Sequence, residues 1–123
     1  MLQVNTTANL NNGMTIKTGM AINYIPYIEN AGPTQDGKGV ILPLGLSCYL
    51  DKDTAQNGIY KSVVPITDGS ESIDKRSLYR TEIEYTNEEW NSPTGVNRDT
   101  METKLIPVLE AWNKDWAGNI VKV

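Results

Sequence analysis

Apolar residues alternate with other residues most regularly between Val40 and Leu50. Because successive side chains of a strand point to opposite faces, this alternation predicts a strand with one buried face. We expect the buried face to consist of Leu42, Leu44, Leu46, Cys48 and Leu50. A second alternating stretch runs from Leu78 to Tyr85, in which Arg80, Glu82 and Glu84 occupy every other position. The pattern indicates an antiparallel sheet with one wet face.

Shorter strands are predicted at residues 2–4, 14–28, 59–66 and 120–123. The second of these is broken by Thr18-Gly19. Pro26 cannot donate a ladder hydrogen bond, so this strand is either an edge strand or ends near Tyr27. Both ends of the chain are expected to be paired or packed, as in a subunit held inside an assembly, because free ends fray.

Polar segments predict four exposed loops between these strands: Asn5 to Gly13, Gly32 to Gly39, Asp51 to Gly58 and Asp68 to Arg76. The third ends in Asn57-Gly58, a pair that tolerates positive φ. We therefore interpret the strands on either side of it as a hairpin.

Two helical segments are predicted. The stretch Thr86-Asn87-Glu88-Glu89-Trp90 is typical of a short helical turn that begins with a capping box. A longer helix is predicted at about residues 98–115, with its apolar residues at helical spacing and Asp99 and Glu102 near its N-terminus: Met101, Leu105, Val108, Leu109 and Trp112. Pro107 costs about 3 kcal/mol in a helix interior, so the helix kinks or starts late. Gly118 should end it.

The sequence therefore predicts an α+β, β-rich fold over residues 1–123, in one domain. We expect an antiparallel sheet or sandwich of about six strands, with one C-terminal helix on the sheet and a terminal strand. The 123 residues can bury a single core, and 39% of them are apolar.

Charge and cysteine content exclude several partners. The chain carries a net charge of -4, and its 11 basic residues are scattered, so nucleic acid is not expected. No apolar run approaches the roughly 20 residues that span a membrane. No secretory signal is visible, so we expect the chain to be kept or assembled in the cytoplasm. Cys48 is the only cysteine, which rules out an internal disulfide.

The chain contains no histidine. This excludes Ser-His-Asp and Cys-His nucleophile systems, histidine general bases and imidazole metal ligands. We expect no catalytic residue, no cofactor and no enzyme activity.

Three patterns resemble functional sites without completing them. Gly32 to Gly39 matches the first seven positions of a phosphate-binding loop, but Gly39 replaces the Ser or Thr, and a strand follows where a helix is needed. Glu82 and Glu84 share a strand face, as a glycosidase pair does, but Arg80 shares it too. The segment from Asp51 to Gly58 lacks the ligand order of a calcium loop; a weakly bound divalent cation there stays an open alternative.

Six tyrosines and three tryptophans are present. Their rings combine apolar area with a polar group and can stack on sugars or line an interface. We expect Trp112 to belong to the core and Trp90 and Trp116 to be the more exposed ones.

The layout resembles the small virion structural proteins of tailed phages, especially those of Bacteroidota hosts. The resemblance lies in the Asn/Thr-rich opening up to Gly13-Met14-Thr15-Ile16-Lys17-Thr18-Gly19-Met20, the central strands, the segment Thr86 to Trp90, and the close from Leu105 to Val123. It implies a symmetric, multi-copy component of the virion, from the tail, neck or baseplate, or a capsid decoration protein. Its partners would be copies of itself and other structural proteins, and it would carry no catalytic residue.

The sequence leaves two other classes open. One is a monomeric module that binds carbohydrate or peptide on Trp and Tyr platforms. The other, an enzyme, is the least favoured. We expect the structural subunit to act through exposed strand edges and the four polar loops.

Overall fold

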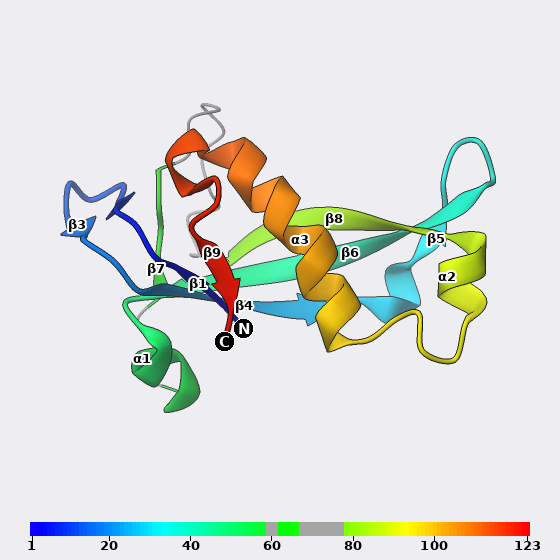
Figure 1. Ribbon diagram of the computed structural model, residues 1–123, viewed down its shortest axis with the longest axis horizontal. Coiled ribbons are helices and arrows are strands. Elements are labelled where there is room, and N and C mark those ends of the chain that lie inside the picture. Colours follow the sequence, from blue (N-terminus) through cyan, green and yellow to red (C-terminus); the bar gives the residue numbers. More distant parts are fainter. Residues whose placement is uncertain (59–61, 67–77) are drawn as a thin grey trace.

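A computed structural model describes residues 1–58, 62–66 and 78–123 of the chain; for Leu78 and Tyr79 it describes the backbone alone. The predicted α+β, β-rich fold is confirmed. Its centre is an antiparallel sheet, accompanied by a small hairpin (Figure 1). The sheet contains β1 (Leu2–Val4), β4 (Met20–Pro26), β5 (Gly32–Pro33), β6 (Gly39–Tyr49), β7 (Ser62–Val63), β8 (Leu78–Thr86) and β9 (Ile120–Lys122); the hairpin contains β2 (Ala8–Asn9) and β3 (Thr15–Ile16).

The long strand β6 organises the sheet. It pairs with β4 and β5 along one edge and with β8 and β7 along the other. The main order is β9-β1-β4-β6-β8, and each pairing is antiparallel. The helices are η1 (Ile28–Asn30), α1 (Lys52–Gln56), α2 (Asn87–Asn91), α3 (Arg98–Trp112) and η2 (Lys114–Trp116). The result is a sheet with a helix on it, not a sandwich.

Both ends of the chain are paired, as predicted. Strand β1 lies between β4 and β9, and the Val123 amide donates to the Met1 carbonyl at 3.1 Å. Figure 1 shows the two termini side by side. The N-terminal strand thus joins both ends of the chain into one sheet.

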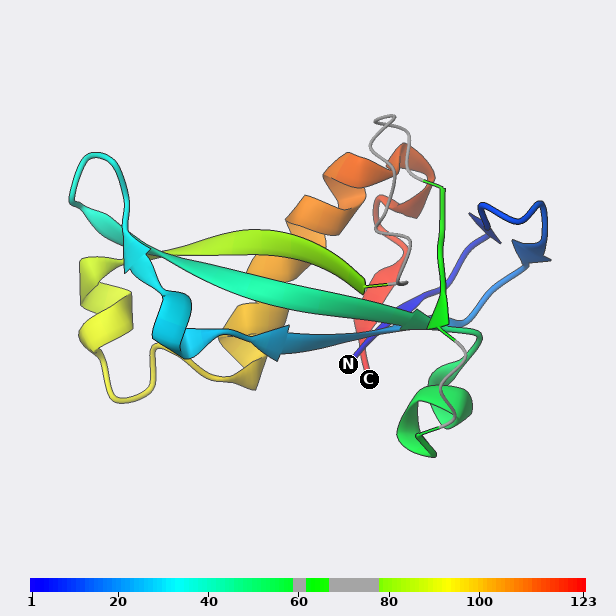
Figure 2. The ribbon, with the colours of Figure 1, turned by 180° about the vertical axis from the view of Figure 1, so that it is seen from behind.

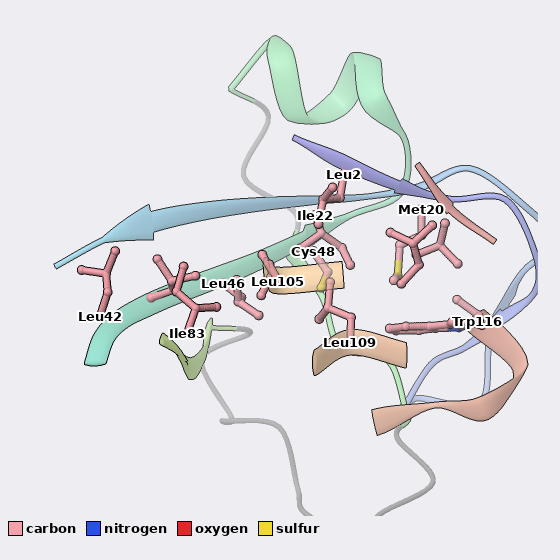
Figure 3. Close-up of a cluster of buried hydrophobic side chains, with 14 of the residues drawn as sticks. Leu2, Met20, Ile22, Leu42, Leu46, Cys48, Ile83, Leu105, Leu109 and Trp116 are labelled. Atoms are coloured by element: carbon pink, nitrogen blue, oxygen red, sulfur yellow. The ribbon is translucent and has the colours of Figure 1, made fainter. Parts of the chain in front are cut away.

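The core lies between the sheet and α3 (Figure 3). Four of the five residues predicted for the buried face of β6 are buried, namely Leu42, Leu44, Leu46 and Cys48. Leu50 is the exception: it is 41% exposed, because β6 ends at Tyr49 and the chain bends there. On β8, Ile83 and Tyr85 are buried and the intervening charged residues are exposed, as predicted.

Helix α3 begins at Arg98 as predicted but ends at Trp112, three residues earlier than expected. Asn113 adopts an extended conformation and leads into η2, so the predicted helix is two elements. The helix does not start late at Pro107; it continues through this exposed residue and forgoes the hydrogen bond to the Thr103 carbonyl. Gly118, with a φ of 76°, turns the chain into β9.

The predicted capping box at α2 is confirmed. The Thr86 hydroxyl accepts from the Glu89 amide at 3.1 Å, and the Glu89 carboxylate accepts from the Thr86 amide at 2.9 Å. These reciprocal bonds satisfy two amides that a helix start leaves free.

Three predicted loops contain regular structure. The segment Asn5 to Gly13 includes β2 and buries Ala8 and Leu10, because the hairpin packs these small apolar side chains inward. Gly32 to Gly39 opens with β5 and is therefore a hairpin. Asp51 to Gly58 contains α1, whose first amides Asp51 caps.

The predicted strand 14–28 is divided into β3 and β4. The break lies at Gly19, because its φ of 91° is outside the range of regular strands. The second part ends at Pro26 as predicted, although it is an interior strand. Of the predicted strand 59–66, β7 pairs with β6 as the hairpin requires, while residues 59–61 lie outside the described residues. The predicted loop from Asp68 to Arg76 lies wholly outside them.

Candidate functional site

In the loop that resembles a phosphate-binding loop, backbone amides donate hydrogen bonds to groups of the same loop. The Lys38 amide donates to the Asp36 carboxylate at 3.0 Å, and the Gly39 amide donates to the Thr34 hydroxyl at 3.1 Å. The amides of Thr34 and Gly37 donate to carbonyls of the same turn. The Thr34 hydroxyl and the Lys38 amide hold the pKa of Asp36 below its usual value. These amides are therefore already bonded within the turn, one of them to an acidic side chain, where a phosphate-binding loop would offer them to the phosphate.

A groove of about 540 Å³ separates this turn from α2 and α3. Lys104, the cation of α3 that reaches it, lies 3.3 Å from Glu89 and 4.8 Å from the ring centre of Tyr85. Thr86 and Lys104 together lower the pKa of Glu89, with the Thr86 amide as the first cause. The charge of Lys104 is therefore already paired within the groove, whose lining also includes Lys38 and the acidic residues Asp36, Glu84 and Glu89.

Glu82 and Glu84 do not converge on a common substrate position. Both are exposed on one face of β8, as predicted, but Glu84 lines the 540 Å³ groove and Glu82 lines a different hollow. Asp51, in the predicted cation loop, accepts from the Thr54 amide at 2.7 Å and caps α1; that hydrogen bond lowers its pKa. Among the described residues no three Cys, Asp or Glu side chains form a metal-sized cluster.

The prediction for the tryptophans is half wrong. Trp116 is 1% exposed, because η2 folds its ring back onto the core beside Met20 and Leu109 (Figure 3). Its Nε1 has no hydrogen-bond partner among the described residues. Trp90 is half-buried and meets Tyr85 edge-on, with the ring centres 5.8 Å apart. One of the two proposed sugar platforms is therefore unavailable.

The buried Cys48 and the half-buried Tyr24 have altered acidity. Burial raises the pKa of the Cys48 thiol to about 12, so this thiol is inert in the fold. Burial, and then the nearby Glu102 carboxylate, raise the pKa of Tyr24 to about 12. Glu102 itself is 2% exposed and ion-pairs with Arg98 at 3.4 Å and with the Met1 ammonium at 3.2 Å. This cluster ties α3 to the sheet.

One side of the sheet faces away from α3, and we call it the open face. Strand alternation assigns to it Gln3, Ala21, Asn23, Ile25, Ile41, Pro43, Gly45, Arg80, Glu82, Glu84 and Val121. Figure 2 shows the sheet from this side, with α3 behind it. Among the described helices, α1 lies on this side, near β4 and the end of β6 (Figure 3).

Apolar side chains are exposed on the open face. Ile25 is 57% exposed and Val121 is 38% exposed. Ile41 and Pro43, on the neighbouring strand, are half-buried. An antiparallel sheet often has one solvated face, but such a face is usually lined by polar residues. Here three strands contribute apolar residues to the open face, and β8 contributes the charged ones.

The ring of Tyr27 covers Gly45 at the centre of the open face. A Cβ at Gly45 would lie 2.7 Å from the Tyr27 hydroxyl, so a larger residue at this position would require the ring to shift. The Arg80 guanidinium lies 5.2 Å from the ring centre. Beside this stack is a hollow of about 480 Å³, lined by Tyr27, Asn30, Pro43, Arg80, Thr81 and Glu82.

Sequence reasoning predicted one wet face of the sheet but missed its exposed apolar residues and the ring of Tyr27 on it, although one signal was present. A glycine inside an otherwise alternating strand often marks a close approach by another group. Gly45 is such a residue, and the approaching group is Tyr27. Glu102 gave no signal, because a glutamate near a helix start is ordinarily exposed.

None of the described helices is long and apolar enough to span a membrane. No protein-family model, curated protein or solved structure matches the chain.

Proposed function

We propose that this protein is a structural subunit of a large multi-copy assembly, which acts through protein–protein interfaces. The observation that carries the proposal is the open face, a sheet surface with exposed apolar side chains that α3 leaves uncovered. A sheet face that carries exposed apolar side chains and is covered by no described helix over most of its area is a candidate interaction surface in a small protein. Partners would be copies of this chain and other structural proteins.

The assembly we propose is a phage virion, put together in the host cytoplasm. This follows from the resemblance of the chain to small virion proteins of tailed phages, and the position would be in the tail, neck or baseplate. A capsid decoration protein is the alternative within the same class. Neither position requires catalytic residues, cofactors or a metal.

A monomeric carbohydrate-binding or peptide-binding module is less well supported. That hypothesis relied on Trp90 and Trp116 as platforms, and Trp116 is buried. Trp90 keeps part of its ring against Tyr85. Of the two tryptophans on which that hypothesis relied, only the half-buried Trp90 is left for a glycan to stack on.

Sedimentation of the purified full chain, over the widest accessible concentration range, tests the proposal. We expect oligomers, and we expect Ile25→Ser to shift the chain towards smaller species because it replaces an apolar contact on the open face. Met14→Ser is the matched control, because Met14 is 61% exposed but precedes β3 of the separate hairpin. A chain that stays monomeric at every concentration would overturn the proposal, and binding of that monomer to a glycan array would favour the rival.

A further inference from the structure

Strand β8 forms a long edge of the sheet. Its nine residues pair with β6 on one side, and no described strand pairs with the other side (Figures 1 and 2). The opposite edge of the sheet is β9, which has three residues. Natural proteins keep open edges short or block them, because an unpaired edge is a template for another strand. The β8 edge contains neither proline nor bulge within its register.

The register shows which backbone groups face outward. The Pro43 carbonyl accepts from the Tyr27 amide at 3.0 Å, so this carbonyl points away from β8. Pro43 is directly opposite Glu82, which makes this a non-hydrogen-bonded pair. The amide and carbonyl of Glu82 therefore point to the free edge. By alternation, those of Arg80 and Glu84 do so as well.

The side chains on this edge distinguish between possible partner registers. For two antiparallel copies of β8, a two-fold axis at Ile83 would place Glu82 opposite Glu84 of the second copy, a repulsive pair. An axis at Glu82 would place Arg80 opposite Glu84 of the second copy twice, but it would also place Glu82 opposite itself, a repulsive pair at the centre of the contact. An axis at Thr81 places Arg80 opposite Glu82 of the second copy, and this happens twice by symmetry. Opposite charges on directly facing strand positions stabilise pairing, and like charges destabilise it.

We infer that β8 pairs with β8 of a second copy of this chain, antiparallel, with the two-fold axis at Thr81. This inference rests on the proposed function and names the first contact of the assembly. Charge complementarity favours a second copy of the chain as the partner. Strand β8 carries both Arg80 and Glu82, so each copy supplies one member of each ion pair. Such an isologous contact is the commonest kind in symmetric oligomers.

The geometry around Arg80 suits this contact. Its guanidinium is held over the ring of Tyr27, on the open face and next to the hollow that Glu82 also lines. Guanidinium N–H groups lie in the plane of the group, so stacking on a ring leaves them free to donate to a carboxylate. Pairing of the two edges keeps both copies of α3 on one side of the joined sheet. The two open faces then form one continuous surface for further subunits.

Charge reversal tests the register. Arg80→Glu and Glu82→Arg should each weaken dimerisation about tenfold, because two attractive pairs become repulsive. The double variant, which carries both changes, should restore the dimer even though the stacking of Arg80 on Tyr27 is lost. Glu84→Arg is the matched control on the same face, since the Thr81 axis places it opposite Leu78. Weakening by Glu84→Arg, or failure of the double variant to recover, would overturn the inferred register.

Cysteine cross-linking gives an independent measurement. Residues opposite each other in a non-hydrogen-bonded pair have Cα atoms about 4.5 Å apart, within the disulfide range. Thr81→Cys should therefore form a disulfide dimer under mild oxidation. Glu84→Cys should not, because the axis separates the two copies of position 84 by about 20 Å. Cys48 is buried and stays in place in both variants.

The two tests separate this inference from the proposed function. Oligomers that persist in both single charge variants, with no Thr81→Cys cross-link, would overturn the β8 contact and leave the structural role intact. A chain that is monomeric even before substitution would overturn both.

Discussion

The two faces of the central sheet are built from the same strands and behave differently. On the covered face, the side chains of Leu42, Leu44, Leu46, Ile83 and Tyr85 are buried almost completely in the core that α3 covers. On the open face, the intervening residues of the same strands are glycine, proline, charged residues and partly exposed aliphatic ones. The difference shows that a period of two residues assigns side chains to faces, but the amount of burial depends on what packs against each face.

The largest expected effect comes from removing core side chains. Leu44→Ala, on the covered face, should lower the free energy of unfolding by about 2–5 kcal/mol, because it leaves a cavity under α3. Ile25→Ala, on the open face, should change it by less than about 0.5 kcal/mol. Urea unfolding of the two variants measures the difference. Equal losses would mean that the open face is covered within the isolated chain.

The next largest effect is expected at Glu102, the buried carboxylate of α3. Glu102→Gln keeps the shape of the side chain but leaves the Met1 ammonium and Arg98 without their counter-charge. We expect a loss of about 1–3 kcal/mol, below the cost for a fully buried pair, because Arg98 is largely exposed. Arg98→Gln removes only the exposed partner and should cost less. If both variants cost the same, burial of Glu102 is not the cause.

Alanine substitutions at two glycines of β6 should have smaller effects on stability, and the two differ in what a Cβ would meet. A Cβ at Gly39 would lie 2.5 Å from the Tyr85 carbonyl oxygen, which belongs to the backbone and cannot move without breaking the β6–β8 register. Gly39→Ala should cost about 1–3 kcal/mol. At Gly45 the obstacle is the ring of Tyr27, which can swing away, so Gly45→Ala should cost less than about 1 kcal/mol.

Thermal unfolding ranks the two glycine variants, and the NMR signals of the Arg80 side chain report whether the stack on Tyr27 is lost. A larger cost for Gly45→Ala would show that the ring of Tyr27 is fixed and that the open face is more rigid than its exposure indicates.

The smallest effect at neutral pH concerns Cys48. Its pKa rises from 9.0 to about 12 on folding, so the unfolded chain loses this proton at a lower pH than the folded chain. Stability is therefore unchanged below pH 9 and falls as the pH rises from 9 towards 12. Tyr24 adds to the fall only above pH 10, its ordinary pKa.

Urea unfolding between pH 8 and 10 tests this assignment, since Cys48→Ala should remove the fall that begins near pH 9. Tyr24→Phe is the control, because it should alter the curve only at higher pH. A fall that is unchanged in Cys48→Ala would assign it to another group.

The sequence by itself determined the elements whose signals are local. The alternation of β6 and β8, the capping box of α2, the start of α3 and the turn at Gly118 all depend on residues within a few positions of one another. The short helix α1 escaped prediction, because five residues offer too little periodicity to separate a helix from a polar loop.

Only the tertiary structure decided which positions are buried and which surfaces are free. Trp116 and Glu102 are buried because distant elements close over them, and Leu50 is exposed because its strand ends one residue earlier. The open face and the free edge of β8 depend on where α3 lies and on which strands pair. These contacts join residues that are far apart in the chain, so no local pattern encodes them.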